Sequence, residues 1–349
     1  MTEPTLTAKP ADTSTPAPAV ADGAAPRPIY LDAQGQTRTG LSLDDINSVI
    51  AQKSGSLWVD LDITKPGQPE VLKGIKGLHP LAVEDALCVN SRPKLEEYDG
   101  YLFMIIIGVR FSETTEDPYD LETFDLCFFL GKNFLITVHE GGSASIDEVG
   151  RRIEKNPDLL SRGMDRLTHA IMDGAVDAYF PLLEKIDDFV DRLEQRVVID
   201  FDQSALKEIF AVKRLVLSLR RHVSPEREVF NILTNRPSAL LSPESQVYFR
   251  DIYDHVLRIN DSIDTYRDLL SSVLDSYLTQ VSNRLGRVTK GLSVVATLSI
   301  PFVVISGMWG MNVEHIPLSG HPHAFWWMLA LQLGLGIVLL VILRFRKLL

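Results

Sequence analysis

Two long uncharged stretches near the C-terminal end constrain the fold of this 349-residue chain more than any other feature. Residues 291–313 form a run of 23 residues without a charge, and residues 324–343 form a run of 20. A helix of roughly 20 apolar residues crosses the ~30 Å hydrocarbon layer of a bilayer. The second run opens with Trp326 and Trp327, which favour the membrane interface. We therefore predict two transmembrane helices in a lipid bilayer; two buried core helices are the alternative.

The positive charges around these runs predict their orientation. Lysine and arginine flank the pair of runs on both outer sides, whereas the loop of residues 314–323 has none; the flanking residues are Arg284, Arg287, Lys290, Arg344, Arg346 and Lys347. The positive-inside rule then places both termini in the cytoplasm, with residues 344–349 as a basic cytoplasmic tail and residues 314–323 as an external loop. We expect a multi-pass protein of the cell (inner or plasma) membrane. Two helices cannot enclose a water-filled path, so transport would require several copies around an axis.

The rest of the chain divides into three further parts. Residues 1–28 are rich in Ala, Pro and Thr and are predicted to be a disordered tail. Residues 29–161 are predicted to form an α/β domain, with strands at 56–61, 101–109, 126–130 and 134–138 and helices at 43–52 and 80–89. Residues 162–241 have a helical period and are expected to form a coiled pair. Residues 242–290 are predicted to form a stalk helix, because no Gly or Pro interrupts residues 244–284. Continued through the first apolar run, this helix would be ~100 Å long.

Composition excludes several classes of function. Thirty-five basic against 46 acidic residues give a net charge of −11, which argues against a nucleic-acid partner and favours a cationic one. The two cysteines, Cys88 and Cys127, exclude a disulfide framework and a four-cysteine zinc site. The chain has no His-x-x-x-His pair, no Walker-type phosphate loop and no Gly-x-Ser-x-Gly elbow. A membrane-tethered hydrolase, or any other enzyme acting on a small-molecule substrate, is therefore not expected.

The outer end of the first span carries the segment Gly307-Met308-Trp309-Gly310-Met311-Asn312. Glycines allow close backbone approach, and a ring of Asn312 carbonyl oxygens could hydrogen-bond a hydrated cation. Mg²⁺ loses its water reluctantly, so an outer-sphere contact of this kind suits it. The alternative is that Asn312 caps the helix and Gly310 breaks it.

The predicted stalk carries an acidic row on one face and an apolar stripe about 200° away. The row consists of Asp251, Asp254, Asp261, Asp264, Asp268 and Asp275, and the stripe of Val256, Ile259, Ile263, Tyr266, Leu270, Val273, Tyr277 and Val281. The row is either a solvated face or, in an oligomer, a set of hard oxygen ligands around the axis. Continued from Asp275, the same spacing predicts pore-facing positions at Gly286, Thr289, Ser293, Ala296, Ile300, Val303 and Gly307. Because the register drifts by ~20° per heptad, Leu292 and Thr297 are alternatives.

The segment Gly310-Met311-Asn312 after an apolar span, followed by a second span that ends in Arg and Lys, resembles the CorA family of magnesium transport proteins. The similarity extends to residues 79–85, 92–98, 248–255 and 282–284, and it covers about residues 29–349. It implies a homopentameric channel with a cytoplasmic α/β funnel, long stalk helices and a pore lined by the first transmembrane helix. Gly310, Met311 and Asn312 would form the selectivity filter. Mg²⁺ would be both the transported and the regulatory ion, with Co²⁺, Ni²⁺ or Zn²⁺ as further cargo.

The resemblance also implies a regulatory site between subunits. Asp85 and Asp251 would face each other across a subunit boundary and bind Mg²⁺, with Glu84 and Asp177 in a second, weaker site; taken alone, Glu84 and Asp85 are an ordinary surface acidic pair. Like charges repel unless a cation neutralises them, so loss of cytoplasmic Mg²⁺ would open the channel.

The chain departs from the family pattern at two places. Gly286 and Thr289 stand where an Asn and a Met commonly precede the first span, and the outer loop reads Ile316-Pro317-Leu318-Ser319, so that Glu314 would supply the acidic group at the mouth. The predicted function is a Mg²⁺ influx channel. The alternatives are a Zn²⁺, Co²⁺ or Ni²⁺ transporter of the same architecture and a non-conducting Mg²⁺-sensing membrane scaffold.

Overall fold

The computed structural model describes residues 27–89, 91–111, 121–199, 203–311 and 320–346. The chain forms two compact units, which we describe separately. The sheet unit comprises Met1–Val190 and Phe210–Asp268, and the span unit comprises Asp191–Ile209 and Leu269–Leu349.

The sheet unit contains a seven-stranded sheet in the order β2-β1-β3-β7-β6-β5-β4. Neighbouring strands are antiparallel except for β3 and β7, which are parallel. The strands are β1 (Arg27–Leu31), β2 (Thr37–Thr39), β3 (Ser56–Asp62), β4 (Lys94–Tyr98), β5 (Tyr101–Phe111), β6 (Leu121–Gly131) and β7 (Phe134–His139). The predicted strands at 56–61, 101–109, 126–130 and 134–138 are confirmed, whereas β1, β2 and β4 were not predicted.

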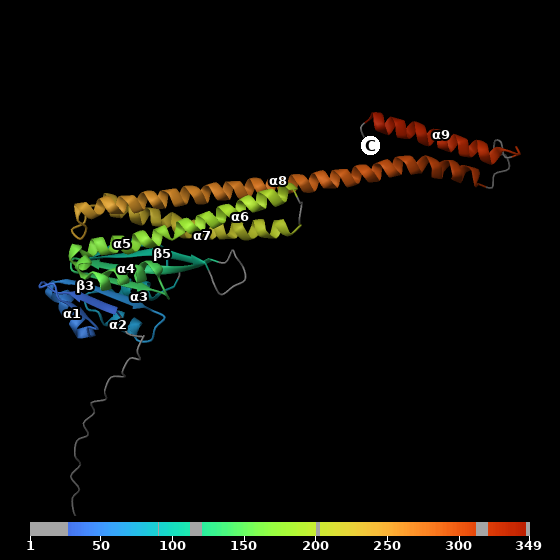
Figure 1. The fold of residues 1–349 in the computed structure, drawn as a ribbon. Coiled ribbons are helices and arrows are strands. Elements are labelled where there is room, and N and C mark those ends of the chain that lie inside the picture. The colour runs from blue at the N-terminus through green and yellow to red at the C-terminus, as the bar shows by residue number, and fades with distance from the viewer. Residues whose placement is uncertain (1–26, 90, 112–120, 200–202, 312–319, 347–349) are drawn as a thin grey trace, which may run out of the picture. The chain divides into compact units, whose positions relative to one another are not determined.

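Helices cover both faces of this sheet, as Figure 1 shows. On one face, α1 (Leu43–Gln52), α2 (Gln68–Gly74) and α3 (Pro80–Leu87) share a buried apolar core with alternate residues of the central strands, such as Leu57, Val59 and Leu61. On the other face lie α4 (Ala144–Lys155) and α5 (Met164–Asp177), joined by the short 3-10 helix η1 (Pro157–Arg162). Strands buried on both faces are continuous apolar runs, which is why the sequence displays them so plainly.

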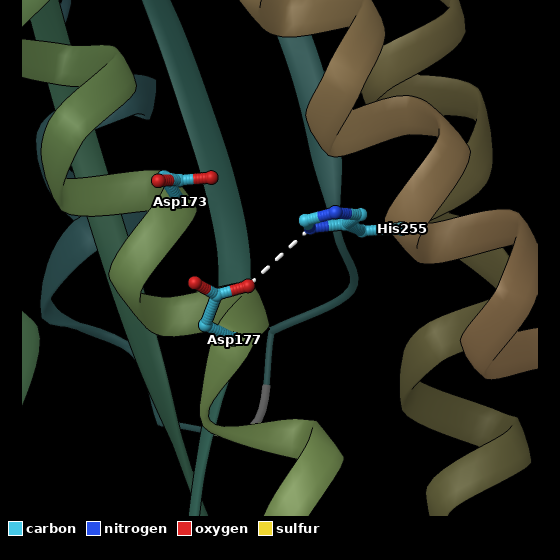
Figure 2. A group of neighbouring side chains, drawn as sticks. All are labelled: Asp173, Asp177 and His255. Carbon is cyan, nitrogen blue, oxygen red and sulfur yellow. Dashed lines mark ion pairs between the residues drawn. The ribbon is translucent and has the colours of Figure 1, made fainter.

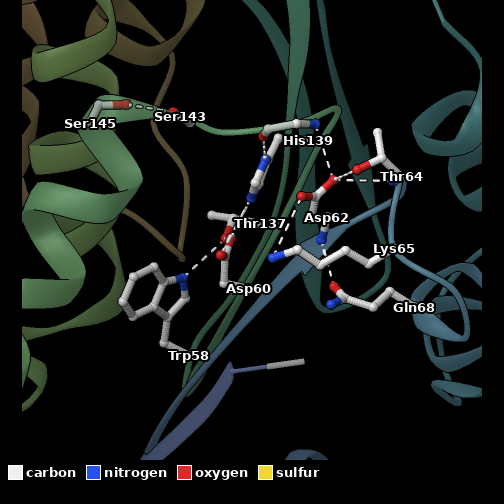
Figure 3. A network of polar contacts seen from close by, with 11 residues as sticks. Trp58, Asp60, Asp62, Thr64, Lys65, Gln68, Thr137, His139, Ser143 and Ser145 are labelled. Atoms are coloured by element: carbon white, nitrogen blue, oxygen red, sulfur yellow. Dashed lines mark hydrogen bonds and ion pairs between the residues drawn. The ribbon is translucent and has the colours of Figure 1, made fainter. Parts of the chain in front are cut away.

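A polar network fixes the carboxyl ends of β3 and β7 (Figure 3). The Asp62 carboxylate accepts hydrogen bonds from the Gly141 N–H at 3.0 Å and from the Thr64 hydroxyl at 2.6 Å. The His139 ring lies between the Gly141 carbonyl oxygen and the Asp60 carboxylate, the latter 3.2 Å from Nε2. Burial disfavours the charged ring, but hydrogen bonds to Asp60 and Gly141 raise the pKa of His139 above its ordinary value. The network therefore holds the turn that leads into α4 and, through it, α5.

Four long helices follow. They are α6 (Tyr179–Ile199), α7 (Gln203–Asn235), α8 (Pro243–Trp309) and α9 (Ala324–Phe345). Helix α8 runs for 67 residues without a break and continues through Pro301. The predicted fold class, an α/β domain with a long stalk helix continuous with the first of two apolar helices, is confirmed.

The apolar stripe of α8 is buried over most of its length. Val256, Ile259, Ile263, Leu270, Val273 and Tyr277 are at most 5% exposed. Two members of the predicted stripe differ, since Tyr266 is half-buried and Val281 is exposed. The stripe therefore ends about one turn earlier than predicted.

The two apolar runs lie outside the core. Among the described residues, two helices are long and apolar enough to cross a membrane, namely α8 and α9. In the most apolar 18-residue stretch of each helix, the buried share is 0% for α8 and 11% for α9. Large apolar side chains such as Leu292, Val303 and Ile337 are exposed by 65–70%. The alternative of two buried core helices is therefore wrong for this chain.

Candidate functional site

Helix α8 ends at Trp309, between Gly307 in its last turn and Gly310 directly after it. The Gly310 N–H donates to the Ser306 carbonyl oxygen at 3.0 Å and to that of Gly307 at 3.2 Å, and Met311 is 56% exposed. A Cβ at position 310 would lie 3.4 Å from the Ser306 oxygen, an ordinary van der Waals contact, so space around this position does not by itself require glycine. Asn312 and Glu314 lie outside the residues that the structure describes, and their roles in the filter and at the mouth stay predictions.

The apolar C-terminal part of α8 has two distinct faces. The partly covered side chains are Val294, Leu298, Pro301, Phe302, Ile305 and Trp309. All seven pore-facing positions predicted between Gly286 and Gly307 are exposed, as are the alternatives Leu292 and Thr297. At 100° per residue, the mean direction of the seven lies about 160° from that of the partly covered set. The predicted pore face is therefore free in the single chain and points away from the covered side.

A buried amide links α9 to α8 next to the glycine pair. Gln332 of α9 is 8% exposed, and its Nε2 donates to the Ser306 hydroxyl at 2.8 Å and to the Phe302 carbonyl oxygen at 3.4 Å. Gly336, one turn later, allows the close approach of the Phe302 ring, which would lie 2.7 Å from an added Cβ. A polar group in a membrane needs a partner, so this contact fixes the register of the two helices one turn before Gly310. Gln332 was not predicted as a site residue, although it is the lone side-chain amide in an uncharged run of 20 residues.

The acidic row on α8 is partly neutralised within the chain. Asp264 lies 3.1 Å from Arg220 of α7, and Arg267 pairs with Asp268 at 2.9 Å. The exposed members without an ion-pair partner among the described residues are Asp251, Asp254, Asp261 and Asp275. Within the described part of the chain, the row therefore retains four carboxylates that form no ion pair.

Three potential metal ligands meet between α5 and α8 (Figure 2). Ligand atoms of Asp173, Asp177 and His255 all lie within 4.8 Å of one another, and His255 Nδ1 is 3.3 Å from an Asp177 oxygen. Burial raises the pKa of Asp173, and the nearby Asp177 and Asp251 carboxylates raise it further. Two carboxylates and an imidazole at this spacing can bind a divalent cation. Of the three, only Asp177 was predicted from the sequence as a metal ligand.

The other predicted regulatory residues lie on α3 and α8. The Asp85 carboxylate is 2.6 Å from Lys94 Nζ, and the same ammonium group is 3.0 Å from Glu96. Glu84 and Asp251 are exposed. The ligand group of Figure 2 contains Asp177 but none of Glu84, Asp85 or Asp251. Within one chain, therefore, Asp85 is a paired carboxylate.

Comparisons with known proteins agree on one family. The family model described as a CorA-like Mg²⁺ transporter protein matches residues 53–347. The cobalt/magnesium transport protein CorA of Thermotoga maritima is 32% identical over 307 residues, 87% of each chain. The putative metal ion transporter YfjQ of Bacillus subtilis is 33% identical over 284 residues, 81% of this chain and 87% of the relative.

Solved structures show the same fold. The complete CorA magnesium transporter from Methanocaldococcus jannaschii superposes with a TM-score of 0.77 at 21% identity, covering 91% of this chain and 97% of that one. The full-length CmaX protein gives a TM-score of 0.71 at 20% identity, covering 92% and 97%.

Proposed function

The chain belongs to the CorA-like Mg²⁺ transporter family and is a divalent-cation transporter or channel of that family, and from this premise we propose that it forms a homopentameric channel for Mg²⁺ influx. The observation that carries the proposal is the exposed face of α8 opposite its covered side. This face consists of small, hydroxylated or apolar groups and leads to the Gly310-Met311-Asn312 segment. Several copies around an axis turn such a face into a conduit with few fixed charges.

Within this channel, each predicted group has a role that its chemistry suits. Asn312, supported by the backbone of Gly310 and Met311, would hold the hydrated ion through its carbonyl oxygen, and Glu314 would attract cations at the mouth. The conduit would be lined by Asp275, Gly286, Thr289, Ser293, Ala296, Ile300, Val303 and Gly307. Both termini would be cytoplasmic, in the inner or plasma membrane.

We further propose that cytoplasmic Mg²⁺ closes the channel. Asp85 and Asp251 of neighbouring subunits would share one ion, and Glu84 and Asp177 would contribute to a second. Asp173 and His255 belong with Asp177 on geometric grounds, because the three can reach one cation. Ions that bind the closed assembly more tightly than the open one stabilise it by that difference in affinity.

The nature of the ligands bears on which ions are accepted. The relatives named above are described as a cobalt/magnesium transport protein and a putative metal ion transporter. Carboxylates and water suit Mg²⁺, whereas the imidazole of His255 also suits Co²⁺, Ni²⁺ and Zn²⁺. We therefore expect the softer ions to compete with Mg²⁺ at the regulatory group more strongly than at the filter.

The test is ion flux into liposomes that contain the purified full-length protein. We expect Mg²⁺ entry without an imposed pH gradient, and its loss in Asn312→Ala. Asn235→Ala, which removes an exposed asparagine at the end of α7, is the matched control. No cation entry at all would favour the scaffold, and entry of Zn²⁺ in preference to Mg²⁺ would favour the alternative cargo. Unchanged flux in Asn312→Ala would make Asn312 a helix cap only.

A further inference from the structure

A cavity of about 260 Å³ lies in the sheet unit among α4, η1, α5 and α8, apart from the groups discussed above. Three arginines reach it from three different elements: Arg152 from α4, Arg162 from η1 and Arg166 from α5. Its floor is apolar, with Ile153 and Leu167 among the lining residues, and Tyr248 of α8 closes one side.

The charge of this cavity is opposite to that of the chain. The whole chain carries 46 acidic against 35 basic residues, yet none of the described residues that line the cavity is acidic. Three guanidinium groups around one cavity repel one another, and an anion bound between them would relieve that repulsion. The cavity is therefore suited to an anion, whereas the proposed ion pathway is suited to cations.

The arginines are available to such an anion. Among the described residues, Arg162 has no ion-pair or hydrogen-bond partner. Arg152 shares the exposed Glu148 with Arg151, and Arg166 lies 3.3 Å from Glu244, which is 84% exposed. Exposed ion pairs of this kind contribute little, so a ligand can displace them. The Arg166 guanidinium also lies over the Tyr248 ring, 4.0 Å from its centroid, which orients its planar donor edge.

Size and shape narrow the class of ligand. Guanidinium groups match the oxygens of phosphate with pairs of parallel hydrogen bonds. The cavity volume is just below the roughly 300–1,000 Å³ usual for ligand pockets, so it suits a body of one or two rings. We propose that this cavity binds a small organic monophosphate of about the size of a nucleoside monophosphate. The phosphate contacts Arg152, Arg162 and Arg166, and the apolar body rests on Ile153 and Leu167.

The test is calorimetric titration of the full chain in detergent with AMP, in the presence of a chelator so that cation binding plays no part. We expect saturable binding of one AMP per chain. Arg162→Gln should weaken it about tenfold or more, the usual effect of losing one charged hydrogen bond. The matched control is Arg151→Gln on α4, next to Arg152 but outside the cavity lining, which should leave the affinity unchanged. The thermal unfolding midpoint without ligand should be the same in all three proteins, since Arg162 is exposed and unpartnered.

Three further ligands test which parts of AMP the cavity recognises. Adenosine and inorganic phosphate should each bind more weakly than AMP, because each fills only part of the cavity. Glycerol phosphate stands for a lipid headgroup, and tighter binding of it than of AMP would identify a lipid rather than a free metabolite as the source of the phosphate. The proposal is overturned if AMP shows no saturable binding below about 10 mM, or if Arg162→Gln binds it as well as the parent does.

Discussion

Glu226 provides the sharpest prediction about the sheet unit, because a carboxyl group there is completely enclosed. It lies on α7, and its Oε1 accepts a hydrogen bond from the Ile107 N–H of β5 at 2.6 Å. The Tyr179 hydroxyl donates to the Ile107 carbonyl oxygen at 2.9 Å. Strand β4 pairs with β5 only as far as Ile105, so side chains from the helices take the place of a strand at Ile107.

Enclosure of Glu226 should make stability depend on pH. Burial raises the pKa of Glu226 from its ordinary value of 4.5 to about 8. Between these two values the folded chain keeps a proton that the unfolded chain releases, so stability is full below pH 4.5 and falls as pH rises toward 8. At ~1.36 kcal/mol per pKa unit, the loss is roughly 5 kcal/mol over the whole window and roughly 3 kcal/mol by pH 7.

The variant Glu226→Gln should remove this dependence, because an amide does not titrate. The unpartnered N–H group of the new amide lowers the free energy of unfolding by about 1–3 kcal/mol at every pH. The test is therefore the change of stability with pH, not its value at one pH. Between pH 4.5 and pH 7 the unfolding midpoint of the parent should fall by roughly 6–12 °C relative to that of the variant. The midpoint is measured by circular dichroism in detergent with a chelator. Glu228→Gln, an exposed neighbour on α7, should retain the slope of the parent. Parallel profiles of parent and Glu226→Gln would mean that Glu226 is ionised in the folded chain, and would refute the reasoning.

Three other variants test the proposed channel. Gln332→Leu removes the amide that binds Ser306 and should weaken the packing of α9 against α8 by about 1 kcal/mol. Flux should then be lost at a lower temperature on heating, and an unchanged midpoint would show that the contact is dispensable. Lys94→Met frees the Asp85 carboxylate for a cation, so Mg²⁺ should protect the chain from limited proteolysis at a several-fold lower concentration than in the parent. If the protecting concentration is unchanged, Asp85 does not belong to the regulatory site. The double variant Asp85→Asn with Asp251→Asn should lose most of the protection that ~20 mM Mg²⁺ gives to the parent, millimolar affinity being usual for weak carboxylate sites. Equal protection would place the sensor elsewhere.

The strands that the sequence revealed are those whose burial makes them continuously apolar. Residues 101–109 and 126–130 lie in central strands covered on both faces, and their composition alone marks them. Strand β4 reads Lys-Leu-Glu-Glu-Tyr at the edge of the sheet, where half-exposed positions accept charge, so no apolar pattern marks it. Strand β1 begins at Arg27 with a proline at its second position, and a Pro-rich segment gives no sign of a strand.

In the candidate site, too, residues related by local spacing were predictable, whereas residues brought together by packing were not. Spacing within one helix predicts which residues of α8 share a face, because helical geometry alone sets this; that this face lines a pore stays a prediction. The group of Asp173, Asp177 and His255 depends on how α5 packs against α8, because His255 lies far from the two aspartates in the sequence. No local pattern contains such packing, so His255 could be recognised only in the folded chain. Gln332 is intermediate, since its isolation in an apolar run indicates a partner without identifying Ser306.

The ion pair of Asp85 changes where the force for gating would arise. From the sequence, we predicted that loss of Mg²⁺ would leave the carboxylates of Asp85 and Asp251 without a cation between them, so that they would repel each other. Lys94 neutralises Asp85 in the folded chain, whereas Asp251 lies on the same face of α8 as His255 and raises the pKa of Asp173. Negative charge therefore gathers on α5 and α8, where the three carboxylates of Asp173, Asp177 and Asp251 lie near the two imidazoles of His169 and His255. We infer that repulsion upon Mg²⁺ release is generated chiefly on the α5 and α8 side of the proposed boundary, and that Lys94 limits the contribution of Asp85.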